Sequence, residues 1–132
     1  MSKRSEGHIA DQMDNRWQFS DVKTNSTVGP ALVADPQSAK EVRHLDFLHF
    51  SILNKNTLSF SMTAQVRDAS IAGTVLWQTS MLLGGSSTFQ VSPAGIHLTA
   101  TPGKGFSFTT DTVQPSVTAA VNAAGWTDQS NN

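Results

Sequence analysis

The chain has 132 residues, with 9 Lys and Arg against 10 Asp and Glu, no Cys, and a formal net charge of −1. This length suits one domain and argues against a two-domain enzyme with a cleft between its halves. The balanced charge disfavours nonspecific binding of nucleic acid, and the lack of Cys excludes disulfides and Cys-ligated metal sites. Because there is no apolar run of roughly 20 residues and no secretory signal, we expect a soluble, non-exported chain with no membrane partner.

Charged residues are concentrated near the N-terminus. Residues 1–40 carry 10 of the 19 charged side chains, whereas residues 69–132 carry only Lys104, Asp111 and Asp128. A lone soluble domain usually has about a quarter charged residues at its surface. A C-terminal half solvated mainly by Ser and Thr is therefore typical of a surface that packs against neighbouring proteins.

The first 40 residues differ from the rest of the chain. Their large apolar side chains fall close to helical spacing, which predicts one or two amphipathic turns: Ile9, Met13, Trp17 and Phe19. Residues 24–36 are rich in Asn, Ser, Thr, Gly and Pro, a composition typical of an extended segment. We therefore predict an N-terminal arm over residues 1–40, which a partner holds in place, and a separate domain over residues 41–132.

From residue 46 onward apolar residues recur with a period of two, which predicts β-strands. The clearest case is Leu58–Val66, where five apolar residues alternate with polar ones. The turn-forming Asn54-Lys55-Asn56 precedes it, so we predict a hairpin with Phe47–Leu53. Further strands are expected between Gly- and Pro-rich turns, at residues 74–83, 88–92, 96–100, 106–110 and 116–123.

Seven short strands with no helix after residue 45 predict an all-β fold, an antiparallel β-sandwich or jelly roll. Its core should consist of large aromatic side chains: Phe47, Phe50, Phe60, Trp77, Phe89, Phe106 and Phe108. In the last strand, alternation places four residues inward: Val117, Ala119, Val121 and Ala123. The residues between them form an uncharged outer face: Ser116, Thr118, Ala120 and Asn122.

The sequence offers one candidate catalytic pattern. His44, Asp46 and His97 match the H-x-D motif with a distant His that binds iron in jelly-roll oxygenases, but the chain is short for such an enzyme and has no cosubstrate motif. The nucleophile motifs G-x-S-x-G and S-x-x-K are absent. Gly103-Lys104-Gly105 is superficially similar to a phosphate-binding loop, but it lies between predicted strands, so a hairpin turn explains it better. We therefore predict no enzyme activity, no metal and no cofactor, with the iron triad as an alternative.

Two of the three tryptophans are candidates for an interface. Trp77 alternates with Val75 in a predicted strand and belongs to the expected core, whereas Trp17 and Trp126 flank the sandwich and have no core to enter. The predicted partner-binding residues are Ile9, Met13, Trp17, Phe19 and Trp126. A glycan-binding platform, which would need exposed coplanar aromatic rings, is a minority alternative because the outward residues are mostly Ser, Thr and Gln.

Four segments carry a resemblance to a known group of proteins: RHLDFLHFSILNKNT, VLWQTSMLLGGSSTFQV, GIHLTATPGKGFSF and SVTAAVNAAGW. In these segments the chain from Arg43 to Asp128 resembles small β-sandwich virion proteins of tailed bacteriophages. The resemblance implies a jelly-roll-like building block, a decoration or cement protein on the head. It further implies synthesis in the host cytoplasm and contact with the major capsid protein or other shell proteins. No catalytic residue is implied.

Symmetry adds an expectation about assembly. Jelly rolls often close their sheet edges by association, and threefold positions are natural sites on an icosahedral shell. We therefore expect a homotrimer. A neck or tail structural protein, and a host-glycan-binding module of the virion, are the alternative functions.

Overall fold

The computed structural model describes residues 15–24, 31–32, 35–110 and 116–129. Within these ranges the regular secondary structure consists of nine β-strands: β1 (Arg16–Thr24), β2 (Ala31–Leu32), β3 (Glu41–Asn54), β4 (Phe60–Asp68), β5 (Val75–Leu83), β6 (Thr88–Val91), β7 (Leu98–Thr99), β8 (Phe106–Thr110) and β9 (Val117–Gln129). In this part of the chain no helix is long and apolar enough to cross a membrane.

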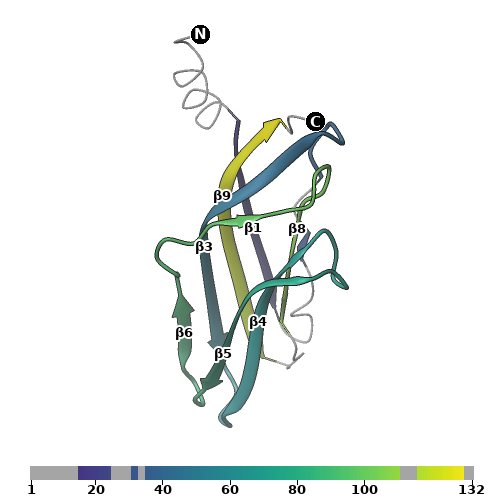
Figure 1. Ribbon diagram of the computed structural model, residues 1–132. Coiled ribbons are helices and arrows are strands. Elements are labelled where there is room, and N and C mark those ends of the chain that lie inside the picture. Colours follow the sequence, from purple (N-terminus) through teal and green to yellow (C-terminus); the bar gives the residue numbers. More distant parts are fainter. Residues whose placement is uncertain (1–14, 25–30, 33–34, 111–115, 130–132) are drawn as a thin grey trace.

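The strands form two antiparallel sheets. Sheet A has the order β1-β9-β3-β6, with β7 also paired to β3, and sheet B has the order β2-β8-β4-β5. The pair β3–β9 extends along the molecule (Figure 1), from Glu41 opposite Gln129 to Asn54 opposite Val117. The other edge of β3 is shared, since β7 pairs with His44 and Leu45 and β6 pairs with residues 50–53. The predicted all-β antiparallel sandwich is confirmed.

The core lies between the inner faces of the two sheets. In β9 the predicted alternation is confirmed: Val117, Val121 and Ala123 are buried, and Ala119 packs against the core. Aromatic rings from both sheets meet there, since Phe50 of β3 contacts Phe108 of β8 edge to face at 6.3 Å. Such pairs add about 0.5–1.5 kcal/mol beyond the burial of their area, so these rings help to fix the two sheets on each other.

The predicted hairpin between Phe47–Leu53 and Leu58–Val66 is wrong, because β3 belongs to sheet A and β4 to sheet B. The connection between them crosses from one sheet to the other. The fully buried Asn54 side chain stabilises this crossing, since its Nδ2 donates to the carbonyls of Leu58 and Gly84 and its Oδ1 accepts from the Asn56 N–H. The turn residues thus form a bend between sheets, and β4 pairs instead with β5 and β8.

The expected aromatic core is partly correct. Phe50, Phe106 and Phe108 are buried, and the other rings except one pack against the core while partly exposed: Phe60, Trp77 and Phe89. The exception is Phe47, which is 46% exposed. A bulge between Leu45 and Phe47 leaves Asp46 without a partner in β9 and shifts the alternation, so Phe47 faces outward.

The predicted boundary of the arm is wrong for part of residues 1–40. Arg16–Thr24 is a strand rather than a helical turn, and it pairs with β9 over nine residues, from Arg16 opposite Trp126 to Thr24 opposite Thr118. The same alternation that builds the other strands operates here, because Trp17 and Phe19 face the core while Arg16 and Gln18 face outward. Ile9 and Met13 lie outside the described residues.

Candidate functional site

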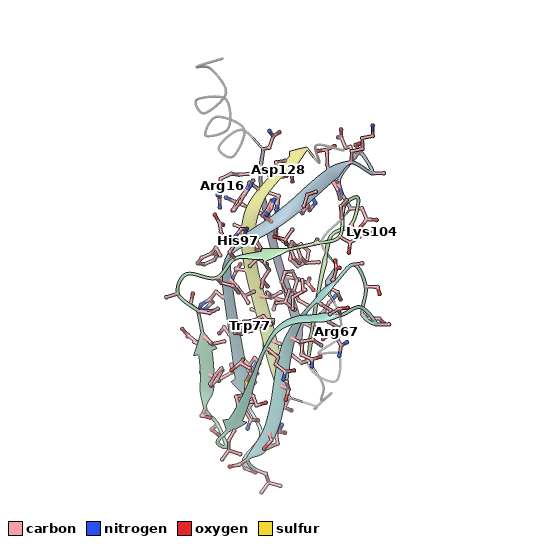
Figure 2. All side chains as sticks on the ribbon, viewed as in Figure 1. Arg16, Arg67, Trp77, His97, Lys104 and Asp128 are labelled. Atoms are coloured by element: carbon pink, nitrogen blue, oxygen red, sulfur yellow. The ribbon has the colours of Figure 1, made fainter. Side chains whose placement is uncertain are left out.

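The chemically richest part of the described surface is one end of the outer face of sheet A, where β1, β9, β3 and β7 lie side by side. In register, His44 of β3 is opposite Thr99 of β7 on one side and Trp126 of β9 on the other. Directly opposed residues in antiparallel strands place their side chains in contact on one face. Figure 2 shows Arg16, His97 and Asp128 at this end of the molecule.

His44 is the centre of a cluster with Thr99, His97, Trp126 and Asp128, which we name the His44 cluster. The imidazole of His44 stacks on the Trp126 indole, with 4.6 Å between ring centroids and 11° between planes. Its Nε2 lies 3.2 Å from Oδ2 of Asp128, and its Nδ1 lies 3.1 Å from Nε2 of His97 and 3.2 Å from Oγ1 of Thr99. The His44 side chain is only 14% exposed, so its partners hold the ring in one position.

A charged pair borders the His44 cluster. The Arg16 guanidinium donates from Nη1 and Nη2 to the two carboxylate oxygens of Asp46, at 3.0 and 2.8 Å. These hydrogen bonds raise the pKa of Arg16 above its ordinary value, against a smaller desolvation effect. The bulge in β3 explains the pair, since Asp46 is the residue that has no partner in β9 and is therefore displaced from the regular alternation.

The alternative of an iron triad is tested by this geometry. The structure brings His44 and His97 together, as the H-x-D pattern required, but the Asp46 carboxylate is bound to Arg16 instead of joining them. Among the described residues, no group of three or more His, Cys, Asp or Glu side chains is placed to hold a metal ion. The triad of His44, Asp46 and His97 is therefore wrong as a single ligand set.

The predicted partner-binding residues fall into three places: the core, the outer face of sheet A, and the part of the chain outside the described residues, to which Ile9 and Met13 belong. Trp17 is 9% exposed, tilts against Phe106 at 5.8 Å and donates from Nε1 to the carbonyl of His44. Phe19 stacks on Phe108. The expectation that Trp17 has no core to enter is wrong, because β1 carries it into the core, and only Trp126 lies in the outer cluster.

A second cationic side chain, Arg43, lies against the ring of Trp17. The Arg43 guanidinium lies 5.8 Å from the Trp17 ring centroid, and its Nη1 donates to Thr127 Oγ1. Arg43 lines a shallow polar hollow together with Arg16 and Glu41. Desolvation by burial lowers the pKa of Arg43 from its ordinary value, opposed by the nearby carboxylates of Glu41 and Asp35.

The reasoning from sequence missed Asp128 and Thr99 as members of the His44 cluster. Asp128 lies two positions after Trp126, so alternation along β9 places both on the same face, but the predicted strand ended at residue 123. Thr99 lies two positions after His97. In both cases the period of two showed which face the residue lies on, but the sequence did not show which strands are neighbours in the sheet.

The outer face of sheet B has a different character. Its side chains bond to one another across the β4–β5 pair: Thr63 with Ser80 at 3.1 Å, and Gln65 Nε2 with Gln78 Oε1 at 3.0 Å. Arg67 donates from Nε and Nη2 to Gln65 Oε1. At one end of this face large apolar side chains are exposed, Leu82 at 73% and Leu58, in the turn before β4, at 76%.

Comparisons with known proteins give a fold and no family. No family model and no curated protein matches the chain. Solved structures with a similar fold include a chain of the acidic stable capsid of Helicobacter pylori bacteriophage KHP30, with 10% identity over 85% of this chain and 87% of that one and a TM-score of 0.49. Another is the Drosophila NLP core, with 11% identity, 84% and 96% coverage and a TM-score of 0.47. A third is the family 11 carbohydrate-binding module from Clostridium thermocellum, with 11% identity, 84% and 83% coverage and a TM-score of 0.41. At these identities and TM-scores the likenesses do not bear on function.

Proposed function

We propose that this protein is a structural component of a virus particle, a decoration or cement protein that binds and stabilises the outer surface of a bacteriophage head. The observation that carries the proposal is the charge-poor outer face of sheet B. Along β4 and β5 the outward side chains include Ser61, Thr63, Gln65, Gln78, Ser80 and Leu82, and the charge of Arg67 on the same face is bonded to Gln65 and to the carbonyl of Gly73.

Such a face suits permanent contact with another protein. Covering a charge without a partner is costly, and a polar group that loses water without gaining a hydrogen bond also carries a penalty. On sheet B the Thr63–Ser80 and Gln65–Gln78 bonds already join these groups to each other. A shell protein can therefore cover the face at low desolvation cost, while burial of Leu58 and Leu82 contributes roughly 25 cal/mol per Å² of apolar area.

A purely structural role requires no reacting group. Each additional bound copy lowers the free energy of the closed shell by mass action, so many individually modest contacts add up to a stabilised particle. The resemblance of residues 43–128 to virion β-sandwich proteins agrees with this role. We propose the major capsid protein, or another shell protein, as the partner and a structural function in place of catalysis.

The N-terminal segment proposed to bind the shell is shorter than residues 1–40. Because β1 belongs to sheet A, only residues ahead of β1 are left for this role, and Ile9 and Met13, the proposed contacts among them, lie outside the described residues. Among the described strands β1 is at the edge of sheet A, which offers a place for association between copies, as expected for a trimer. Static light scattering on the isolated protein tests the trimer, and a clean monomer at high concentration would contradict it.

The docking face is tested with a matched pair of substitutions. Gln78→Glu places a negative charge on the outer face of sheet B while keeping the oxygen that accepts from Gln65. Gln18→Glu places the same charge on the outer face of sheet A, on an exposed residue of β1. We expect Gln78→Glu to reduce occupancy on purified virions at least tenfold, measured by quantitative mass spectrometry, and Gln18→Glu to leave it unchanged.

Three results would overturn the proposal or part of it. Absence of the wild-type chain from purified virions would refute a virion role altogether. Equal occupancy of the two Glu variants would refute sheet B as the docking face. Immunogold labelling confined to the tail or neck would replace head decoration by the alternative location, whereas labelling over the whole head supports it.

A further inference from the structure

We propose that the edge strand β5 joins two copies of this chain, by antiparallel pairing of β5 with β5 of the second copy, so that sheet B continues from one molecule into the other. Among the described strands only β4 pairs with β5 (Figure 1), so the other edge of β5 has no neighbour in its own sheet. The inference does not rest on the proposed virion role, because it concerns two copies of the chain itself.

β5 lacks the features that keep the other described edge strands from pairing. An edge strand leaves one row of backbone N–H and C=O groups unpaired, and natural proteins protect it with charged side chains, with proline or by making it short. β1 carries Arg16, Asp21 and Lys23, β6 has four residues and β2 has two. β5 has nine residues, with neither a charge nor a proline. Among these edges it is therefore the one best suited to accept another strand.

The lack of charge around β5 favours a second copy as the occupant. Residues 69–103 contain no Asp, Glu, Lys or Arg. A twofold contact brings the same surface of both molecules together, so a charged edge would repel its own copy, whereas this edge does not. A bulge in the β4–β5 pairing leaves Leu76 without a partner in β4, but from Trp77 to Leu83 the strand is regular. Most of β5 is therefore available for pairing with itself.

One register of this pairing matches polar side chains with polar side chains. Thr79 is the middle residue of β5, and antiparallel pairing about it places Thr79 opposite itself and Gln78 opposite Ser80 of the second copy. Gln78 and Ser80 are both exposed on the outer face of sheet B, and Thr–Thr pairs stabilise antiparallel strands. Pairing about Ser80 would instead place Gln78 opposite the apolar Leu82. The register about Thr79 is therefore favoured.

The apolar side chains also match in this register. Trp77, which is half-buried on the inner face, lies opposite Met81 of the second copy, and methionine sulfur packs favourably against aromatic rings. The exposed Val75 and Leu82 are at opposite ends of β5, so antiparallel pairing brings Leu82 next to Val75 of the second copy on the outer face. The contact thus buries apolar side chains on both faces, which favours association.

The proposed contact lies on the opposite side of the sandwich from β1. Trp77 of β5 stacks on Phe50 of β3 at 6.2 Å, whereas Phe19 of β1 stacks on Phe108 of β8 at 5.6 Å. The contact therefore leaves β1 free for the threefold association proposed above. Because antiparallel strands of one sheet share the same two faces, the outer faces of sheet B in the two copies form one continuous surface.

Because the chain has no Cys, a single introduced cysteine reports the contact directly. Thr79→Cys in the full-length protein places two thiols opposite each other, and directly opposed residues of antiparallel strands are close enough for a disulfide after a small adjustment. We expect a disulfide-linked dimer on mild oxidation, measured on a non-reducing gel. The control is Ser61→Cys, an exposed position in β4, which is not an edge strand, and it should stay monomeric.

A charge on the edge should weaken the association. Thr79→Lys installs an inward-pointing charge on the edge strand, as natural proteins do to protect an edge, and places two like charges opposite each other. We expect the dissociation constant, measured by sedimentation at increasing protein concentration, to rise at least fivefold, and Ser61→Lys to leave it unchanged. Circular dichroism verifies that the variants are folded, and Ser80→Lys, on the exposed outer face, is the second variant if Thr79→Lys is unstable.

Several outcomes would overturn the proposal. A wild-type chain that stays monomeric at all concentrations would do so and would leave the β5 edge to a strand of another protein. Association that Thr79→Lys and Ser80→Lys leave unchanged would place the contact elsewhere, for example at β1. Equal crosslinking of Thr79→Cys and Ser61→Cys would equally contradict it. None of these measurements uses virions, so a failure of the β5 contact is distinguished from a failure of the proposed docking face.

Discussion

The outer faces of the two sheets are built by different kinds of contact. On sheet A the contacts join residues that are far apart in sequence: Arg16 with Asp46, 30 positions away, and His44 with Asp128, 84 positions away. On sheet B they join residues of one hairpin: Gln65 with Gln78, 13 positions apart, and Thr63 with Ser80, 17 positions apart. Sheet A therefore gathers charged and aromatic groups that only the complete fold brings together.

This difference separates two kinds of surface within one sandwich. The sheet B face presents uncharged groups already bonded to each other, which suits a surface that another protein covers. The sheet A face concentrates ring nitrogens, carboxylates and guanidinium groups at one end, where they are bonded to one another. If the comparison is correct, changes that disturb the packing of β1, β9 and β3 against one another should cost far more stability than changes to the ladder of sheet B, by which we mean the Gln65–Gln78 and Thr63–Ser80 side-chain bonds.

Trp17→Ala should cause the largest loss in the free energy of unfolding. Trp17 brings β1 into the core and its N–H donates to the carbonyl of His44, so the substitution leaves a cavity and removes this hydrogen bond. Burial of this degree predicts a loss of about 3–5 kcal/mol in the free energy of unfolding, measured in urea. The neighbouring Gln18→Ala, on the outer face of β1, should change it by less than about 0.5 kcal/mol. Equal effects would mean that β1 is not an integral strand of sheet A.

Gly125→Ala should cause the second largest loss in the free energy of unfolding. A Cβ at Gly125 would lie 1.7 Å from the carbonyl oxygen of His44, so the β9 and β3 backbones must separate beneath the His44 cluster. We expect a loss of about 2–3 kcal/mol, the upper part of the range for overpacking. Gly84→Ala, where the nearest atom would be Ser87 Oγ at 3.4 Å, is the control and should cost less than about 1 kcal/mol. A smaller loss for Gly125→Ala than for Gly84→Ala would contradict the close approach of the two strands.

How much of the fold could be predicted from the sequence depends on how far apart in the chain the contacting residues lie. Alternation in residues 58–66 and 116–123 predicted strands correctly, because a half-buried strand records its own burial in a period of two. The same signal was present in Trp17 and Phe19, two positions apart, but the spacing from Ile9 and Met13 favoured a helix instead. Local composition also predicted a turn at Asn54, although it did not tell that the turn joins two sheets.

The His44 cluster was predictable only in part. The H-x-D pattern indicated that His44 and His97 approach each other, and the structure places them together. The pattern also implied Asp46, which the bulge in β3 brings to Arg16 instead. A bulge depends on the register with β9, and Asp128 depends on the same pairing, so neither was visible before the neighbours of β3 were known.

Asp46→Asn should have a modest effect. The substitution removes the charge that Arg16 pairs with, while the bulge and the strands remain. Because both side chains are partly exposed, at 41% and 33%, an effect of about 0.5 kcal/mol is expected, and it should shrink in 1 M salt as the pair is screened. The measurement is urea unfolding at low and high salt. A salt-independent loss above about 2 kcal/mol would show that Asp46 acts through packing and not through the ion pair.

The smallest effect is expected for the ladder of sheet B. In a double-mutant cycle of Gln65→Ala and Gln78→Ala, the coupling energy should be about 0.3–0.5 kcal/mol, because water can replace the exposed bond between the two amides. Ser61→Ala with Gln78→Ala is the control cycle, because Ser61 lies opposite Leu82 and two same-face pairs away from Gln78. A coupling above about 1 kcal/mol between Gln65 and Gln78 would show that this ladder contributes to the stability of the fold, and the contrast between the two faces would then be lost.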